Sequence, residues 1–544
     1  MQEDEPFKRT HVDAGERLFS QRLDLRKHLG YAALEGLLQM KGNDFLVDRT
    51  VGRRKLSAKM MLSLALYLSG YLRTCVKEPR VGIALTPGIG GTLANLAVVF
   101  ADKIPVNLNF TAPHDAVQSS IKAAGVKTVI TATTFRKKFK TFPWPDSVLY
   151  IDALLKAKKG ALIWHNILSR FASVGALASK YRIPEEGDAK EAALLFTSGS
   201  SGEPKGVVLT HRNLLANLAQ IQSIGLIPRT EKMFGCLPLF HSFGFTATLW
   251  YPVIQGVSLV AAPSPLEVRK NTEIIREEGV TLFLGTPTFF RSYLKHASPE
   301  DLQSLKYVVA GAEKTPEGLG EAWEERFGSG YLEGYGLTET TPVVSVNLPP
   351  MQLGSIWVPR AKRGSVGLLF PGMVARIVDP ESGAVNSIHN EGLLQLKGPN
   401  VFPGYLDDPE RTAEVFDGAW FNTGDLAFMD EEGFLYINGR LSRFSKIAGE
   451  MVPHAAIEEA IAEVFDLDLI KSMSFCVVAK PDEQKGERLV VLSTVDCLTK
   501  DAIQKRLHEK GFTNLWIPHE VKRIEAIPLL GSGKIDWQAA KQQA

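Results

Sequence analysis

The sequence has few cysteines and almost no net charge. Its 544 residues include four cysteines, and no two of them form a C-x-x-C pair. Isolated cysteines argue against a disulfide framework or a zinc ribbon, and they indicate a reducing, cytoplasmic compartment. The 62 Lys and Arg residues against 60 Asp and Glu residues give a formal charge of +2. This small charge argues against a strongly basic surface that binds polyanions such as nucleic acids. The four cysteines are Cys75, Cys236, Cys476 and Cys497.

The sequence also indicates neither a secretory leader nor a continuous membrane-spanning run. The N-terminal segment MQEDEPFKRTHVD is polar and has no apolar centre of the kind found in signal peptides. Residues 81–101 carry no charge and are long enough for a transmembrane helix, but Pro87-Gly88-Ile89-Gly90-Gly91 interrupts them. We interpret this run as a buried strand, a loop and a helix of a globular core.

The chain is long enough to contain several hydrophobic cores. Between residues 81 and about 312, β-branched apolar runs alternate with helical segments, which predicts parallel β-α-β units of an α/β fold. After about Pro349 the expected strands are short and separated by Gly and Pro, as in a small β-barrel-like sheet. A last block of about a hundred residues has its own helices and strands, which is enough for a separate domain. We predict a large domain over residues 1–440 and a small α+β domain over residues 441–544.

The strongest chemical signal is the segment TSGSSGEPKG at residues 197–206, which lies between the apolar runs AALLFT and VVLT. Glycines let backbone N–H groups converge on phosphate oxygens, hydroxyls add donors, and Lys205 supplies positive charge. The segment is not a Walker A loop, because the G-x-x-x-x-G-K-[ST] pattern is absent. A flexible Ser/Gly linker is the alternative, but a linker is not expected between two strands. The segment predicts a phosphate-binding loop.

Four further motifs follow this loop in order: YGLTET at residues 335–340, TGD at 423–425, GR at 439–440, and PLLGSGKID at 528–536. With these motifs the sequence resembles the adenylate-forming, AMP-binding superfamily of acyl-CoA synthetases. The resemblance implies the adenylate-forming fold, in which the small C-terminal domain is mobile. It also implies an enzyme that uses ATP and Mg²⁺ to convert a carboxylic acid into an acyl-adenylate, with release of pyrophosphate.

The same resemblance implies the ATP site. Glu339 and Thr197 would bind Mg²⁺, which prefers oxygen ligands. Tyr335 would stack on adenine opposite residues 311–313, and Asp425 would accept hydrogen bonds from the ribose hydroxyls. The residues implied in ATP or AMP binding are Thr197, Ser198, Gly199, Ser200, Ser201, Gly202, Lys205, Gly311, Ala312, Glu313, Tyr335, Gly336, Thr338, Asp425 and Arg440.

Catalytic roles are implied for Lys534, His241 and Glu339. Lys534 occupies a Gly-Ser-Gly-Lys turn from which a cation can swing against the reacting carboxylate and be withdrawn afterwards. His241, in PLFHSFGF, matches a family position between the acid and the nucleotide, with a satisfied core histidine as the alternative.

The resemblance further implies that the small domain rotates between the two half-reactions. The family's pivot is an aspartate or lysine shortly after the GR motif, whereas this chain has Ser442. Since a pivot only has to absorb a backbone rotation, Ser442 is compatible with a hinge at this position. Lys446 and Gly449, in SKIAGEMVPH, would face the site in the thioester-forming conformation.

The acid and its acceptor are argued separately. The segments HSFGFTATLWYPVIQGV and FLGTPTFF offer an apolar, aromatic lining without a fixed charge, which favours a fatty acid over an amino acid. KIAGEMVPH, PLLGSGKID, AGAEKTPE and IPVNLNFT resemble the synthetase half of bacterial bifunctional acyltransferase/acyl-acyl carrier protein synthetases. This local resemblance implies a long-chain fatty acid and the phosphopantetheine thiol of acyl carrier protein as acceptor. With about eighty residues before the first expected β-α-β strand, we expect a synthetase without the acyltransferase half.

Two alternatives stay open. The first is a long-chain fatty acyl-CoA ligase, with CoA as acceptor. The second is a non-catalytic nucleotide-binding or membrane-associated relative, and the intact phosphate loop with Glu339, Asp425 and Lys534 argues against it.

Residues 156–182 form a basic segment with apolar residues at helical spacing, namely Ile163, Ile167, Phe171 and Val174. Such a helix can lie on the anionic inner face of a membrane, which would make the cytoplasmic protein peripherally membrane-bound. A surface helix packed on the protein body is the alternative.

Overall fold

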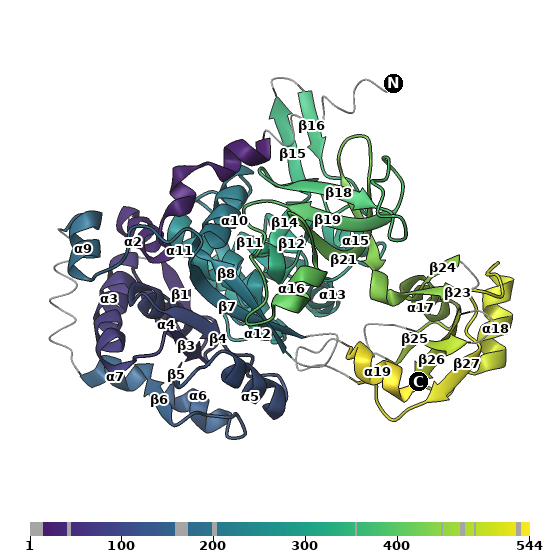
Figure 1. Ribbon diagram of the computed structural model, residues 1–544, viewed down its shortest axis with the longest axis horizontal. Coiled ribbons are helices and arrows are strands. Elements are labelled where there is room, and N and C mark those ends of the chain that lie inside the picture. Colours follow the sequence, from purple (N-terminus) through teal and green to yellow (C-terminus); the bar gives the residue numbers. More distant parts are fainter. Residues whose placement is uncertain are drawn as a thin grey trace.

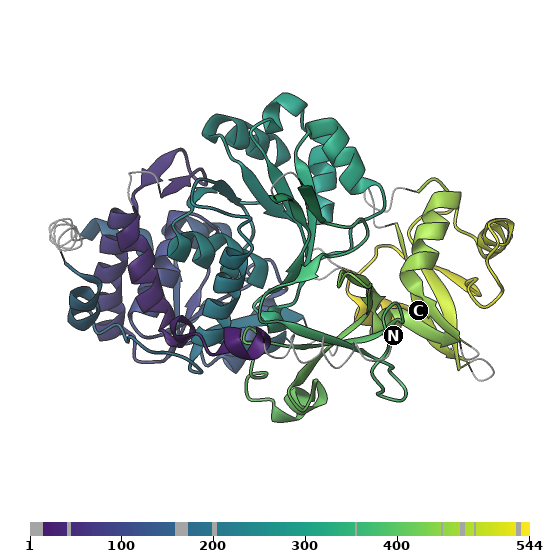
Figure 2. The ribbon, with the colours of Figure 1, turned by 90° about the horizontal axis from the view of Figure 1, so that it is seen from above.

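The computed structural model describes residues 15–40, 45–157, 172–198, 204–353, 356–447, 450–467, 474–482, 486–528 and 535–544. Figure 1 shows a large body that contains the N-terminal and central residues, and a smaller lobe that contains the C-terminal residues. Figure 2 shows the same lobe at one end of the body from a second direction. A large and a small domain are therefore present as expected, while the boundary between residues 440 and 441 stays a prediction.

A six-stranded sheet forms one part of the body, in the order β6-β5-β3-β4-β7-β8. Its first five strands pair in parallel and β8 pairs antiparallel with β7. The strands expected near residues 81, 104, 127, 147 and 192 are thereby confirmed. The strand bounds are Arg80–Ile83 (β3), Ile104–Asn107 (β4), Thr128–Thr131 (β5), Ser147–Tyr150 (β6), Glu191–Ser198 (β7) and Pro204–Thr210 (β8).

A nine-stranded sheet forms the second part, in the order β17-β14-β13-β12-β11-β9-β10-β1-β2. Strands β1 and β9 to β13 pair in parallel, and β2, β14 and β17 are antiparallel additions at the two edges. The bounds are Leu46–Asp48 (β1), Arg54–Leu56 (β2), Lys232–Gly235 (β9), Ser258–Ala261 (β10), Leu282–Gly285 (β11), Tyr307–Ala310 (β12), Gly330–Gly336 (β13), Val343–Val346 (β14) and Leu368–Leu369 (β17).

Helices between the two sheets build one shared core. Apolar side chains of α2, α3, α4 and α10 join those of both sheets in a single buried cluster. The predicted helix around residues 60–68 is part of α3, and residues 81–101 form β3, a loop and α4. Within the described residues, no helix combines the length and apolarity needed to cross a bilayer. The bounds are Leu23–Arg26 (η1), Leu29–Gln39 (α2), Ala58–Cys75 (α3), Ile89–Phe100 (α4), His211–Ser223 (α10), Phe243–Trp250 (η2, a π-helix) and Tyr251–Gln255 (α11).

Other helices cover the outer faces of the two sheets. A separate apolar cluster lies under α5 and α6 on the six-stranded sheet, and another under α12, α13 and α15 on the nine-stranded sheet. The body is thus layered helix, sheet, helix, sheet, helix. The bounds of the outer helices are His114–Ala123 (α5), Thr133–Lys138 (α6), Val268–Glu278 (α12), Pro287–His296 (α13), Pro299–Leu302 (α14) and Leu319–Phe327 (α15). Two short helices, Ile151–Ala157 (α7) and Val174–Lys180 (α9), pack into the shared core instead, and Thr338–Thr340 (η3) follows β13.

Antiparallel strands replace this pattern after residue 348, as the Gly- and Pro-rich texture predicts. β15 and β16 form a hairpin, and β18, β19, β20, β21 and β22 form a five-stranded sheet. The segment GSVGLLFPG differs from the expectation, because its strand β17 pairs with β14 of the nine-stranded sheet and not with the small sheet. The bounds are Leu348–Leu353 (β15), Ile356–Arg360 (β16), Val374–Val378 (β18), Gly392–Lys397 (β19), Pro409–Glu414 (α16), Phe416–Asp417 (β20), Trp420–Met429 (β21) and Leu435–Arg440 (β22).

The C-terminal lobe has a five-stranded sheet of its own, built from β23 to β27. Helices α17 and α18 pack on one face and α19 on the other, in two separate apolar clusters. The expected helices near 455–464 and 501–511 are confirmed. The bounds are Leu441–Arg443 (η4), Phe444–Ile447 (β23), Glu450–Pro453 (β24), His454–Val464 (α17), Phe475–Asp482 (β25), Gly486–Ser493 (β26), Lys500–Glu509 (α18), Glu520–Arg523 (β27) and Trp537–Gln543 (α19).

Candidate active site

Three of the predicted residues meet where the nine-stranded and the small sheets adjoin. Tyr335 lies near the end of β13, whereas Asp425 and Arg440 are paired positions of the ladder between β21 and β22. The Tyr335 hydroxyl donates to Asp425 Oδ2 at 2.5 Å, and Arg440 Nε lies 3.1 Å from Asp425 Oδ1. Each carboxylate oxygen is thus contacted by a different side chain. We call Tyr335, Asp425 and Arg440 the nucleoside cluster.

Burial and charge act in opposite directions on this cluster. Burial raises the pKa of the Asp425 carboxyl, and the Arg440 guanidinium and the Tyr335 hydroxyl oppose that rise. Burial and the adjacent Asp425 raise the pKa of Tyr335 well above its ordinary value. Tyr335 therefore keeps its proton and acts as a donor, while Asp425 keeps lone pairs for further hydroxyl donors.

A second group gathers around Tyr405. The Tyr405 hydroxyl donates to Glu339 Oε1 at 3.0 Å, and Lys205 Nζ lies 5.4 Å from the centroid of the Tyr405 ring. Burial is the main cause of a lowered pKa for Lys205, with Arg411 as the next cause, while Glu339 opposes the shift. Burial and Glu339 together raise the pKa of Tyr405. We call Lys205, Glu339 and Tyr405 the phosphate cluster.

The backbone around Lys205 explains this arrangement. Thr197 and Lys205 are partners across the antiparallel pair of β7 and β8, so the predicted phosphate loop connects two adjacent strands. Gly206 O accepts from Leu406 N at 2.8 Å, which ties the start of β8 to the segment that carries Tyr405. A Cβ on Gly206 would lie 2.9 Å from the Leu406 Cβ, so this close approach requires glycine.

Residues 311–313 lie at the carboxyl end of β12, as a wall beside the nucleoside cluster would require. A Cβ on Gly311 would lie 3.6 Å from the Phe243 ring and 3.5 Å from Gly334 O. Ala312 has a left-handed backbone with φ of 68°, which is uncommon outside glycine and is found at functional sites. Glu313 Oε2 accepts a 2.6 Å hydrogen bond from the Thr288 hydroxyl.

Ser242 connects the His241 segment to the YGLTET motif. The Ser242 and Thr338 hydroxyls are 3.2 Å apart, which brings the turn before η2 against the turn that carries Glu339. His241 itself is exposed, and its ring centroid lies 4.7 Å from that of Phe240. The alternative of a satisfied core histidine is therefore wrong. Gly336 fits this turn because a Cβ there would collide with Pro342 O.

Several predicted residues lie outside the described part of the chain. They are Gly199, Ser200, Ser201, Gly202, Gly449 and Lys534. For Ser198 and Lys446 the backbone is described, as part of β7 and β23. The predicted basic helix over residues 156–182 lies largely outside as well, and of its four apolar residues the structure describes Val174 at the start of α9.

Tyr405 and Arg411 are the site residues that the sequence did not reveal. Tyr405 stands in a loop, GPNVFPGYLDDPERT, without a pattern that indicates chemistry. A hint is Gly404, whose φ of 154° and close approach to Thr412 require glycine and mark a constrained turn. Arg411 follows in α16, where Asp408 caps the helix by accepting from Arg411 N at 3.0 Å.

The side chains of the site are compatible with a Mg²⁺ ion that has few protein ligands. Within the described ranges, no three His, Cys, Asp or Glu side chains form a group that could hold a metal ion. Magnesium is usually bound by one or two carboxylates, with waters and substrate phosphates as the other ligands. A single half-buried carboxylate at Glu339 beside a cationic site is compatible with an ion that arrives with ATP.

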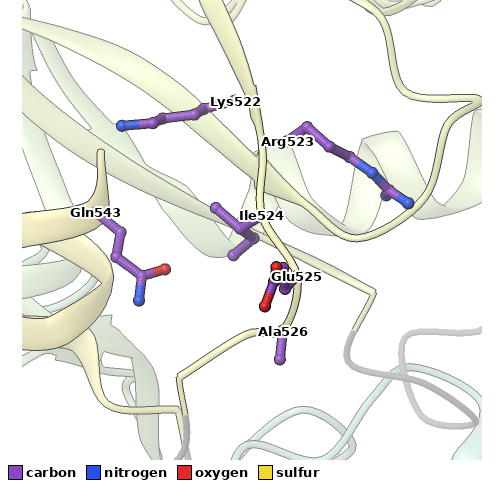
Figure 3. A pocket seen from close by; sticks show the side chains of 6 residues that line it. All are labelled: Lys522, Arg523, Ile524, Glu525, Ala526 and Gln543. Carbon is purple, nitrogen blue, oxygen red and sulfur yellow. The ribbon is translucent and has the colours of Figure 1, made fainter.

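A hollow of about 510 Å³ on the small domain lies elsewhere (Figure 3). Its lining comes from β27, the segment that follows β27, and α19, and it includes none of the predicted site residues. The lining residues are Lys522, Arg523, Ile524, Glu525, Ala526 and Gln543.

Comparison with known proteins identifies the class. The family model described as AMP-binding enzyme matches residues 39–406. A long-chain-fatty-acid–CoA ligase of Bacillus subtilis is 30% identical over 469 residues, which cover 80% of each chain. A long-chain-fatty-acid–CoA ligase of Salmonella typhimurium is 28% identical over 502 residues, which cover 86% of each chain.

Solved structures show the same fold. ATP-bound MatB from Rhodopseudomonas palustris matches 94% of this chain and 98% of its own, with a TM-score of 0.74 and 23% identity. The O-succinylbenzoate coenzyme A synthetase MenE from Bacillus subtilis, solved with ATP and a magnesium ion, matches 94% of this chain and 99% of its own, with a TM-score of 0.75 and 21% identity.

The chain therefore belongs to the AMP-binding enzyme family and has the adenylate-forming fold. Its class is that of AMP-forming acid–thiol ligases, which activate a carboxylic acid as an adenylate. The matched curated relatives described above are CoA ligases. They support the CoA alternative better than the expected acyl carrier protein as acceptor.

Proposed function

We propose that this protein activates a long-chain fatty acid with ATP and transfers the acyl group to the thiol of CoA. The single observation that carries the nucleotide part is the pairing of Asp425 with both Tyr335 and Arg440, which brings three separate predicted residues into one cluster. Support for the acid and for CoA comes from the two fatty-acid–CoA ligases, which match most of the chain.

The nucleoside cluster would bind the adenosine part of ATP. Asp425 accepts hydrogen bonds only when it is ionised, and ribose hydroxyls are suitable donors. Arg440 stabilises that ionised form from 3.1 Å. Tyr335 would present its ring to adenine, with residues 311–313 as the opposite wall.

The phosphate cluster would bind the triphosphate. Lys205 provides a cation, and Thr197 lies across the strand pair from it. Glu339 and Thr197 would hold Mg²⁺, which when bound withdraws negative charge from the phosphates. The acid's carboxylate oxygen then forms a bond to the α-phosphorus, the bond to the pyrophosphate oxygen breaks, and the donors at this end stabilise the departing charge.

The acid would approach from the side of η2. This π-helix is largely buried and apolar, and Phe243 at its start lies against Gly311. Such surroundings suit a hydrocarbon chain and offer no fixed charge for a polar acid. His241 is exposed directly before this helix and would lie near the reacting carboxylate.

The small domain would serve both half-reactions. Lys534 would assist adenylation, and Lys446 and Gly449 would face the site when the thiol attacks the acyl-adenylate. Ser442 lies in η4, between Arg440 of the large domain and Arg443, which forms two 2.8 Å hydrogen bonds to Glu458 of the small domain. A rotation confined to this short turn would leave both anchors intact.

The first experiment is exchange of labelled pyrophosphate into ATP in the presence of saturated fatty acids. We expect exchange to depend on a long-chain acid and on Mg²⁺. A thioester assay in which CoA and holo-acyl carrier protein compete then identifies the acceptor, and we expect acyl-CoA as the main product. No exchange with any fatty acid would refute the ligase proposal and favour a non-catalytic nucleotide-binding relative. Exclusive labelling of the carrier protein would show that acyl carrier protein, and not CoA, is the acceptor.

The role of Lys534 is tested by separating the half-reactions. Lys534→Ala should abolish pyrophosphate exchange but spare thioester formation from preformed acyl-adenylate, because the cation is needed while charge builds on the phosphates. An equal loss of both half-reactions would show that Lys534 has a different role.

Membrane contact through residues 156–182 is a separate part of the proposal. We expect the wild-type protein to float with anionic liposomes. A variant in which the basic residues of this segment are neutralised should no longer float with them. Unchanged flotation would favour the surface-helix interpretation.

A further inference from the structure

Helix α10 carries a row of buried amide side chains. Asn213, Asn217 and Gln220 are spaced by four and three residues, so they lie along one side of the helix. Their exposed fractions are 5%, 0% and 0%. Burying amides is costly unless they are hydrogen-bonded, so three of them on one helix face demand partners.

Asn217 finds its partners on one residue of the nine-stranded sheet. Its Oδ1 accepts from Val343 N at 3.2 Å, and its Nδ2 donates to Val343 O at 2.7 Å. The side-chain amide thereby pairs with both backbone groups of the first residue of β14, as a neighbouring strand would. Asn217 Nδ2 also donates to Gln220 Oε1 at 3.0 Å, which links the two amides.

Gln220 and Asn213 reach a different loop. Gln220 Nε2 donates to Asn400 Oδ1 at 3.0 Å, and Asn213 Nδ2 donates to the carbonyl oxygens of Pro399 and Val401 at 2.9 and 2.8 Å. One helix face therefore holds β14 and the segment 399–401 at the same time.

Asn400 closes the network on the YGLTET turn. Its Nδ2 donates to Thr340 O at 2.7 Å, and its own carbonyl accepts from the Thr341 hydroxyl at 2.7 Å. Thr340, Thr341 and Asn400 are fully buried. Thr341 has φ of 70°, a costly backbone for a β-branched residue, so the surrounding contacts have to hold it there.

The YGLTET turn held by this network carries Glu339, and the segment after Asn400 carries two hydrogen-bond partners of Glu339. Glu339 O accepts from Phe402 N at 2.8 Å, and Glu339 Oε1 accepts from Tyr405 Oη at 3.0 Å. A satisfied amide network in a dry interior has one good geometry, because each bond fixes the orientation of the next. A displacement in the network would therefore move Glu339.

We propose that Asn217, Gln220 and Asn400 are positioning residues, which set the place of Glu339 for the magnesium-bound phosphates of ATP. This inference rests on the proposed role of Glu339. It goes further, because it assigns a part in the reaction to residues that cannot touch substrate.

The first test compares Asn217→Ala with Asn271→Ala as a matched control. Asn271 on α12 is also fully buried, and its Nδ2 donates to Ser264 O and to the Tyr293 hydroxyl at 2.8 and 2.7 Å. Asn217→Ala should reduce kcat of pyrophosphate exchange about tenfold to a hundredfold and leave the KM for the fatty acid within about twofold. Asn271→Ala should lower the unfolding temperature by a similar amount and keep kcat within about threefold.

Equal kcat losses in the two variants would overturn the proposal, as would a wild-type kcat in Asn217→Ala. A loss that appears only in the KM for the fatty acid would overturn it as well, because a displaced Glu339 should change kcat through the magnesium-bound phosphates.

A milder pair keeps the proposal testable if Asn217→Ala does not fold. Thr341→Val preserves shape but removes the hydroxyl bond to Asn400 O, whereas Thr341→Ser keeps that bond. Thr341→Val should weaken Mg·ATP binding about threefold to tenfold in titration calorimetry, and Thr341→Ser should recover most of the affinity. Equal affinities of the two variants would refute the role of the hydroxyl.

The calorimetric titration also separates this inference from the proposed function. It uses Mg·ATP without any acid, so a wrong fatty-acid assignment would abolish exchange in the wild type but leave the titration valid. Wild-type affinity for Mg·ATP in Thr341→Val and Asn217→Ala would overturn the inference even if the fatty-acid assignment is correct.

Discussion

The two ends of the candidate site are built differently. In the nucleoside cluster, Asp425 is 5% exposed at its side chain, and its two oxygens are contacted by Tyr335 and Arg440. In the phosphate cluster, Glu339 and Lys205 are half-buried and converge on Tyr405. The first lies on regular strands around a buried carboxylate, while the second lies on a short turn and at the start of a strand. The comparison contrasts a proposed nucleoside end with a buried acceptor and a proposed phosphate end whose charged groups are half-buried.

The largest effect is expected from the phosphate cluster. Glu339→Gln removes the charge proposed to hold Mg²⁺ but keeps an oxygen that can accept from Tyr405. Pyrophosphate exchange should fall at least about a hundredfold, with a much higher Mg²⁺ requirement, because metal-assisted charge stabilisation is lost. Exchange rates over a range of Mg²⁺ concentrations measure this. Wild-type Mg²⁺ dependence in the variant would show that Glu339 is not a metal ligand.

Asp425→Asn is expected to have the next largest effect. The amide loses the charge that accepts from ribose hydroxyls and that pairs with Arg440. We expect ATP affinity to fall about tenfold to a hundredfold, since hydrogen bonds to charged groups are the stronger ones. Calorimetric titration with ATP and with inorganic pyrophosphate checks the assignment. If pyrophosphate binding fell as much as ATP binding, the two ends of the site could not be distinguished in this way.

A pair of tyrosine variants compares the two ends directly. Tyr335→Phe leaves a buried carboxylate with one partner fewer, whereas Tyr405→Phe leaves a half-buried carboxylate that water can reach. Loss of ATP affinity should be about tenfold for Tyr335→Phe and about threefold for Tyr405→Phe. The reverse order would mean that the phosphate cluster is the more rigid end.

The smallest expected effect is a pH dependence at the nucleoside end. Because burial raises the pKa of Asp425 above 3.8, the folded protein binds this proton more tightly than the unfolded chain does. The stabilising contribution of the group is thus complete below 3.8 and is lost as the pH rises through the folded pKa. Asp425→Asn should remove this pH-dependent contribution, because an amide side chain does not titrate.

Unfolding temperatures of the wild type and Asp425→Asn, measured from about pH 4 to about pH 7, test this sign. The difference between them should shift in favour of the variant as the pH rises. ATP affinity of the wild type should weaken toward acidic pH already above the ordinary range of aspartate. A constant difference in unfolding temperature would contradict the raised pKa of Asp425.

Parts of the fold could be predicted because they follow from local patterns. Strands buried within a sheet are continuous apolar runs, and this property identified β3 to β7 and β10 to β12, whereas β9 was not predicted. β17 was assigned to the wrong sheet, because a two-residue strand in GSVGLLFPG has no pattern that selects its partner. Its place beside β14 is a result of packing.

The site shows the same division. The roles of Glu339 and Asp425 were predicted from the resemblance of their motifs to the family, and these roles stay predictions. Tyr405 stands in a loop without such a pattern, and only the fold shows that its hydroxyl reaches Glu339, 66 residues away. Asn217 looks like an ordinary helix residue in sequence, although it binds both backbone groups of Val343.

The sequence by itself determined most of the parallel strands and the residue types available for nucleotide chemistry, since these depend on periodicity and side-chain charge. The tertiary structure alone decided which distant segments meet, namely Tyr335 with Asp425, Lys205 with Tyr405, and Asn217 with Val343. The physical reason is that hydrogen bonds and burial depend on distance in space, and helices between the two sheets set that distance.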